Sequence, residues 1–228
     1  MEEQPMKKIT VAFLFLILAT GPIANAAQSD VEIKGRRLVL QSPPFTLTLP
    51  SELDLVYSSS HENPGENSTT RIYLLAKTKG KQLEEMLILQ IADRTGPPVA
   101  PMTVPPLRPY TEKRIFLKDR VGKGGVTIDY LIQLMAWNPD APSLQSIVKK
   151  AIVIPPHWAL QGQFQFVYQG EHAVSIRYSR DVNSFGIKVS DAGDAWEKGS
   201  ISGNEKRVYE VFQKTFLGMI ETLRNITP

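Results

Sequence analysis

Apolar and polar residues alternate along much of this chain, and a period of two is typical of half-buried β-strands. In the clearest example, Phe164, Phe166 and Tyr168 alternate with Gln163 and Gln165. Because successive side chains of a strand point to opposite sides, this segment has one apolar and one polar side. The pattern therefore predicts a sheet in which one face of each strand is buried.

A second strand of the same kind follows after a short turn that contains Gly170. Here Val174 and Ile176 alternate with Ser175 and Arg177. Two alternating segments joined by a glycine-containing turn predict an antiparallel pair. We expect the polar side of this pair to face solvent.

Four further segments carry the strand pattern. The predicted strands are residues 45–49, 70–77, 86–92 and 126–136. Gly80 is expected to turn the chain between the second and third of them, and residues 122–125 to form a hairpin turn before the fourth.

Helical spacing is confined to fewer segments. Ser202 and Glu205 match a capping box, and the apolar residues that follow predict an amphipathic helix over 204–224. A shorter helix is predicted over 143–150, and one further helical turn near Leu83. The fold class is therefore α+β, an antiparallel sheet packed against a long C-terminal helix and one or two shorter helices.

The N-terminus has the order of a secretory signal peptide. A basic pair, Lys7 and Lys8, precedes an apolar run over 9–19 and the small-x-small site Ala24-Asn25-Ala26. The run has 11 residues, about 17 Å of helix, whereas a bilayer core is about 30 Å thick. We expect cleavage of residues 1–26 rather than retention as an uncleaved anchor. Translation from Met6 is an alternative start.

Composition narrows the location and the partners. The chain has no cysteine, which excludes disulfides and a cysteine-linked lipid. Its net charge is +3, and the charges of residues 1–26 cancel, so the cleaved chain keeps that value. A dispersed charge of this size does not predict nucleic-acid binding. We expect a bacterial periplasmic or secreted protein without a stable membrane anchor after cleavage.

A proline-rich stretch over 97–109 interrupts the strand pattern. Six of its 13 residues are proline, which excludes a central strand. It is predicted to run extended, as a surface connection within one α+β domain over 27–228 or as a boundary between two halves. Prolines beside aromatic and basic residues also form ligands for protein partners. The candidate partner surface comprises Pro105, Arg108, Tyr110, Lys113 and Arg114.

The chain carries no recognisable catalytic, cofactor or metal motif. His61, His157 and His172 lack the spacing of metal ligands. Ser146 and Lys149 match Ser-x-x-Lys, but the accompanying elements of the penicillin-recognising enzymes are missing. We predict no catalytic residue, no cofactor and no metal.

Three features together resemble the Mog1/PsbP-like family. These are the segment Phe45-Thr-Leu-Thr-Leu-Pro50, the antiparallel meander, and the closing helix with Phe212 and Phe216. The resemblance implies a curved antiparallel sheet packed between helices, and a role in binding or assembly. It names no ligand and transfers no functional residue.

The function predicted from the sequence is that of an exported, non-enzymatic binding or assembly module of the bacterial cell envelope. Its partner would be an unknown protein or an envelope component. The alternative is a periplasmic hydrolase whose site is assembled only in three dimensions, from residues such as Asp129, Glu171, Arg177 and Asp181. A third possibility is a structural surface protein that associates with itself.

Overall fold

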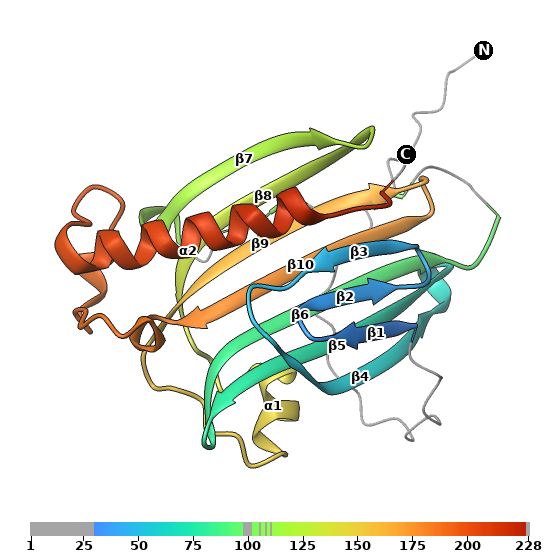
Figure 1. Cartoon of the computed structure of the whole chain (residues 1–228). Coiled ribbons are helices and arrows are strands. Elements are labelled where there is room, and N and C mark those ends of the chain that lie inside the picture. Colours follow the sequence, from blue (N-terminus) through green and yellow to red (C-terminus); the bar gives the residue numbers. More distant parts are fainter. Residues whose placement is uncertain (1–29, 98–101, 105, 108, 110, 227–228) are drawn as a thin grey trace, which may run out of the picture.

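Seven antiparallel strands form the main sheet of the computed structural model, which describes residues 30–97, 102–104, 106–107, 109 and 111–226 (Figure 1). In sheet order the strands are β4 (Asp54–Asn63), β5 (Ser68–Lys79), β6 (Gln82–Arg94), β10 (His172–Asp181), β9 (Trp158–Tyr168), β8 (Val126–Ala136) and β7 (Ile115–Lys123). The predicted α+β class with an antiparallel sheet is confirmed.

The predicted hairpin lies at the centre of this sheet. β9 and β10 pair antiparallel, with Phe164 opposite Ile176 and Gln163 opposite Arg177. β8 flanks β9, and β6 flanks β10. Since β9 and β10 each have a neighbouring strand on both sides, the main-chain hydrogen bonds of the hairpin are satisfied within the sheet.

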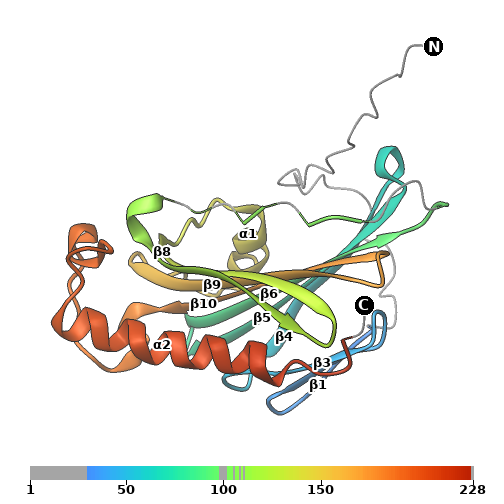
Figure 2. The same ribbon diagram turned by 90° about the horizontal axis from the view of Figure 1, so that it is seen from above.

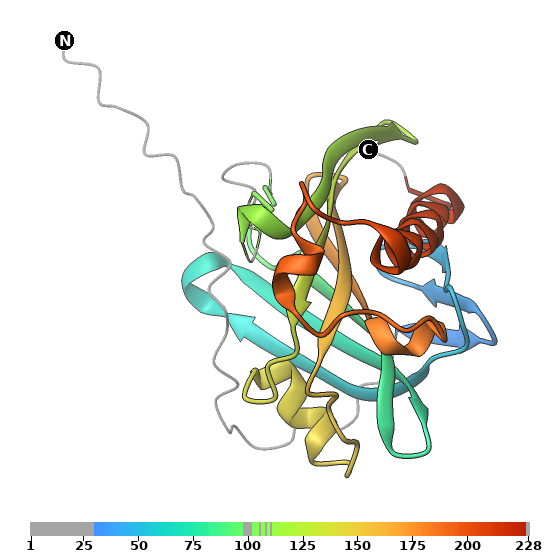
Figure 3. The same ribbon diagram turned by 90° about the vertical axis from the view of Figure 1, so that its left-hand side faces the viewer.

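The first face of the main sheet is the one to which β10 presents Val174, Ile176 and Tyr178. A small sheet of β1 (Val31–Lys34), β2 (Arg37–Leu40) and β3 (Phe45–Thr48) covers one part of it, and helix α2 (Gly203–Thr222) covers another. Figures 2 and 3 show α2 and the small sheet on the same side of the main sheet.

Aromatic packing fixes α2 on this face. The ring of Phe212 stacks on that of Tyr178, with centroids 5.5 Å apart, and Phe216 lies 5.9 Å from Phe164. All four side chains are fully buried. Gly162 of β9 lies directly beneath the Phe216 ring, where a Cβ atom would overlap it. Burial of each aromatic side chain contributes roughly 2 kcal/mol or more.

The second face, on the opposite side, is covered at two places. Helix α1 (Pro142–Val148) places Leu144 and Ile147 in an apolar cluster over the end of the sheet that includes Met86 and Ala159. Near the other end, Met102 and Val104 pack against three small apolar side chains of the sheet, Ala92, Val167 and Ala173. Figure 3 shows α1 on the side of the sheet opposite α2.

The proline-rich stretch belongs to the connection from β6 to β7. Because β10, β9 and β8 lie between these strands, the connection has to cover about 19 Å at the usual strand spacing. Met102 bonds through its backbone N–H to the carbonyl of Gly170, 2.9 Å away. Met102 and Val104 of the connection therefore pack on the second face, and the Met102 hydrogen bond attaches the connection to the β9–β10 turn.

Some local predictions were wrong. Ser202 stands at the N-terminus of α2 but makes no side-chain cap, and Glu205 instead accepts a hydrogen bond from the backbone of Ser190, so the capping box does not form. The helical turn expected near Leu83 is part of β6. Pairing of Leu83 with Thr78 of β5 and its backbone hydrogen bond to Val153 outweigh the local helical signal there.

The predicted signal peptide lies outside the described residues. Within the part of the chain that the structure describes, no helix is both long and apolar enough to span a membrane.

A charged cluster links the small sheet to the main one. Arg71 of β5 donates to Asp93 through Nε, at 2.6 Å, and to Asp30 beside β1 through Nη1, also at 2.6 Å. It also donates to the backbone carbonyl of Ser42, before β3. His172 of β10 lies 2.7 Å from the Asp93 carboxylate through its Nδ1. The guanidinium therefore joins three separate parts of the chain.

This cluster predicts a loss of stability in acid. Burial alone raises the pKa of Asp93, but hydrogen bonds from His172 and Arg71 outweigh it and hold that pKa below its ordinary value. As the pH falls, the unfolded chain takes up the proton first, so the stabilisation present at pH 7 is lost from about pH 5 downward. Asp93→Asn should cost about 2 kcal/mol in the free energy of unfolding at pH 7.

Urea unfolding between pH 7 and pH 3 measures this effect. Below about pH 5 the stability of Asp93→Asn should fall less steeply than that of the wild type. The exposed Asp54 provides the control variant, Asp54→Asn, whose profile should follow the wild type. An equal slope for Asp93→Asn and the wild type would contradict the assignment.

The contact between Gly162 and Phe216 gives a second prediction. Gly162→Ala should destabilise the chain by about 2 kcal/mol, because the added methyl group displaces the Phe216 ring and with it α2. Gly218→Ala, on α2 with open space around it, should stabilise by up to about 1 kcal/mol through helix propensity. Thermal unfolding of both variants measures these changes in stability. An unfolding temperature of Gly162→Ala equal to that of the wild type would contradict the packing of Phe216 on Gly162.

Candidate functional site

The partner surface predicted from the sequence falls partly outside the described residues, since Pro105, Arg108 and Tyr110 are not among them. Lys113 forms an exposed ion pair with Glu197 at 3.7 Å, a contact of little energetic value. The guanidinium of Arg114 lies 4.4 Å above the ring of Trp158. Both basic residues therefore pack against other parts of the same chain.

The residues suggested for a hydrolase do not come together. Asp129 of β8 pairs with Arg120 of β7 at 2.6 Å, and Glu171 is exposed in the β9–β10 turn. Asp181 is buried at the far end of β10, where its carboxylate accepts the backbone N–H of Asn183. Burial is the main cause that raises the pKa of Asp181. Among these four residues, Arg177 alone lies in the middle of the sheet.

The most distinctive group of polar residues is a stripe along the second face, on the two central strands. The polar stripe consists of Gln161, Gln163 and Gln165 of β9 and Ser175, Arg177 and Ser179 of β10. The register places Gln161 opposite Ser179, Gln163 opposite Arg177 and Gln165 opposite Ser175. Alternation along both strands thus puts all six side chains on one face.

Half of the polar stripe is removed from solvent, so the expectation of a solvated polar side was wrong for those residues. Ser179 is fully buried, and Gln161 and Gln165 are nearly so. Gln161 accepts from Gln133 of β8 at 3.0 Å and donates to the Ser179 hydroxyl at 3.2 Å. These side chains are buried because the apolar cluster of α1 and that of Met102 lie over neighbouring parts of the same face.

Between these two apolar covers the stripe stays partly open. Gln163, Ser175 and Arg177 each keep some contact with solvent, and together they form the open part of the stripe. Gln163 donates through Nε2 to the Ser175 hydroxyl, 3.4 Å away. Gln90 of β6, opposite Ser175, borders them and is also partly exposed.

Arg177 is the unusual member of this group. No hydrogen bond or ion pair joins its guanidinium to another described residue, and its nitrogens keep some solvent contact. Burial lowers the pKa of Arg177, and no neighbouring carboxylate acts against that shift. The side chain nevertheless stays charged at neutral pH. A largely buried charge without a partner is costly, so the fold gains nothing from a cation at this position.

Another buried polar group offers a contrast. The carboxylate of Glu85 accepts hydrogen bonds from Tyr178 and Ser51, both at 2.7 Å, and from Lys77 at 3.2 Å. Burial raises the pKa of Glu85, but these bonds and nearby cations lower it overall. Glu85 is saturated by the chain itself, which indicates a structural role.

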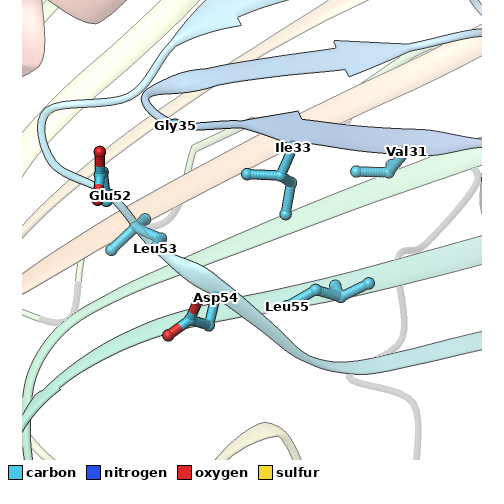
Figure 4. Close-up of a pocket in the computed structure, with 7 residues that line it drawn as sticks. All are labelled: Val31, Ile33, Gly35, Glu52, Leu53, Asp54 and Leu55. Atoms are coloured by element: carbon cyan, nitrogen blue, oxygen red, sulfur yellow. The ribbon is translucent and has the colours of Figure 1, made fainter.

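A shallow hollow of about 420 Å³ lies between β1 and β4. In Figure 4, Ile33 of β1 points across it toward Leu55 of β4. The carboxylates at its border, Glu52 and Asp54, are both exposed. The hollow therefore lacks the convergent polar groups that fix a ligand.

Metal binding finds no support in the part of the chain that the structure describes, where no group of three or more histidine, cysteine or carboxylate side chains is placed to hold an ion. The Nδ1 atom of His172 contacts the carboxylate of Asp93, and the Nδ1 atom of His157 lies 3.4 Å from the carboxylate of Asp191 near the surface.

Part of the polar stripe is visible in the sequence. The alternation of β9 places its glutamines on one side of a strand, and Arg177 is one of the polar residues of the predicted hydrolase site. The sequence does not show that this side of the strands is covered, because the cover comes from α1 and from the connection between β6 and β7. Neither can be placed over a particular strand from periodicity alone.

Comparisons with models of protein families, with curated proteins and with solved structures found no match for this chain.

Because Arg177 has no partner among the described residues, its removal should not weaken the fold. Arg177→Met keeps most of the side-chain volume and should raise the free energy of unfolding by about 1 kcal/mol. Arg71→Met, which removes an arginine that is paired, should instead cost about 3 kcal/mol. Urea unfolding at pH 7 measures both. A loss of more than 1 kcal/mol in Arg177→Met would show that the guanidinium serves the fold.

Proposed function

We propose that this chain is an exported, non-enzymatic binding module whose ligand or partner contacts the second face of the main sheet, at the open part of the polar stripe. The partner would be a protein or another component of the bacterial cell envelope. The observation that carries the proposal is Arg177, a cation held among polar side chains without a described partner.

The argument rests on the energetic cost of that arrangement. An apolar residue at position 177 would suit the neighbouring clusters around Ala159 and Ala173. A guanidinium at this position loses hydration and gains no ion pair in return. Groups that lower stability in this way are characteristic of binding and catalytic sites, where the missing interactions come from the ligand.

Export is supported by the sequence alone. The basic pair, apolar run and small-x-small site of residues 1–26 have the order of a cleaved signal peptide. A chain without cysteine can fold in an oxidising compartment without forming disulfides. The resemblance to the Mog1/PsbP-like family also belongs to this proposal, and it agrees with a role in binding or assembly.

The hydrolase alternative gains no comparable support. Its suggested carboxylates lie on different parts of the sheet, with Asp129 paired on β8 and Asp181 capping the turn after β10. Neither carboxylate contacts Arg177.

A thiol footprint tests where binding occurs. Because the chain has no cysteine, a single introduced thiol is the only site for iodoacetamide. Gln90→Cys places it beside the open part of the stripe without removing a proposed ligand contact, and Val211→Cys places it on the exposed side of α2. Cell-envelope extract should slow alkylation of Gln90→Cys at least threefold and leave Val211→Cys unchanged.

The reverse outcome is equally informative. Protection of Val211→Cys without protection of Gln90→Cys would place binding on the α2 side and contradict the proposal. Protection of neither variant, with extract supplied in excess, would also contradict it.

A further inference from the structure

The charge of the open stripe restricts the ligand. Arg177 contributes one positive charge, and no carboxylate influences its pKa. On the same face, Arg120 forms an ion pair with Asp129, so this pair adds no net charge. A single negative charge therefore balances the site, whereas a phosphate dianion would leave one charge uncompensated in a poorly hydrated position.

The donors of the open stripe restrict the shape of that anion. A guanidinium presents N–H groups as a planar fork, which matches the two oxygens of a carboxylate. The Ser175 hydroxyl accepts from Gln163 Nε2, so its own hydrogen stays available to donate. Gln163 lies opposite Arg177 in the register, and its side-chain amide uses one N–H for Ser175 and keeps the second. Three donors on neighbouring residues are thus available to one carboxylate.

The surroundings favour an apolar remainder of the ligand. Ile88 of β6 lies directly opposite Arg177 and belongs to the apolar cluster beneath α1. On the other side of the open part, Val167 and Ala173 belong to the cluster with Met102. A charged head between two apolar clusters suits an amphiphilic ligand better than a sugar or a highly charged polymer.

We infer that the open part of the polar stripe binds the carboxylate group of a monocarboxylic acid with an apolar tail, through the guanidinium of Arg177 and the hydroxyl of Ser175. This inference rests on the proposed function and names the ligand class of the same site. Arg177 fixes the charge and orientation of the head, and the partly exposed side chains of the two clusters, Ile72 and Val167, border the tail.

The test is an NMR titration with hexanoate as the probe, at constant ionic strength and pH 7. The Arg177 Nε–Hε signal, identified by its loss in Arg177→Gln, should shift with saturation. Hexanamide has the same tail without the charge and should bind at least tenfold more weakly. Inorganic phosphate should also bind more weakly than hexanoate.

Variants separate a specific contact from general attraction. Arg177→Gln should reduce hexanoate affinity at least tenfold, read from the backbone amide of Ser175. Lys118→Gln removes the same charge from an exposed position on the same face and should stay within twofold of the wild type. Arg177→Lys keeps the charge but loses the fork and should weaken binding at least threefold. Unfolding temperatures confirm that each variant is folded.

Several results would overturn the inference. Equal affinity for hexanoate and hexanamide would show that the charge of the ligand plays no part in binding. Equal losses of hexanoate affinity in Arg177→Gln and Lys118→Gln would show that Arg177 acts only through long-range electrostatic attraction. Tighter binding of phosphate would reassign the site to a dianion. If hexanoate fails to bind while envelope extract still protects Gln90→Cys, the ligand class is wrong and the proposed function stands. If both fail, the proposed function falls as well.

Discussion

The structure depends on the contact between α2 and the first face of the main sheet, where the Phe216 ring lies on Gly162 of β9. This contact determines which side of the two central strands is buried beneath the helix. A shift of one residue in β9 would turn every side chain to the opposite face and bring glutamines under α2. Phe212 and Tyr178 stack in the same layer. The placement of the polar stripe on the second face is therefore a direct consequence of aromatic packing on the first.

The second face differs from the first because it carries polar side chains, one of which is an unpaired cation among the described residues. Apolar clusters contributed by α1 and by Met102 flank the stripe, half of which is buried, and its glutamines and serines form hydrogen bonds with one another and with Gln133 of β8. Arg177 alone lacks such a partner among the described residues. By contrast, the Arg71 guanidinium is paired with Asp93 and Asp30, and it joins the two sheets. The two arginines thus have different consequences, since one stabilises the fold and the other is available to an external anion.

Much of the fold could be predicted from the sequence because alternation and helical spacing are local signals. The hairpin of Phe164 and Ile176 and the helix of Phe212 were predicted close to their observed positions. β4 was missed because its residues are mostly polar, as expected of an edge strand that borders solvent. The candidate site could be predicted only in part. Strand order and the covers of the second face are long-range properties, and they decide that Arg177 is only partly exposed to solvent.

The central claim is that the Arg177 guanidinium is reserved for a carboxylate supplied from outside the chain. The most direct measurement is a crystal structure of the cleaved chain, residues 27–228, grown with hexanoate. The account predicts a carboxylate with both oxygens about 2.7–3.0 Å from guanidinium nitrogens of Arg177, and the Ser175 hydroxyl within hydrogen-bond distance. A guanidinium paired with a group of the same chain, with hexanoate absent from the second face, would contradict it.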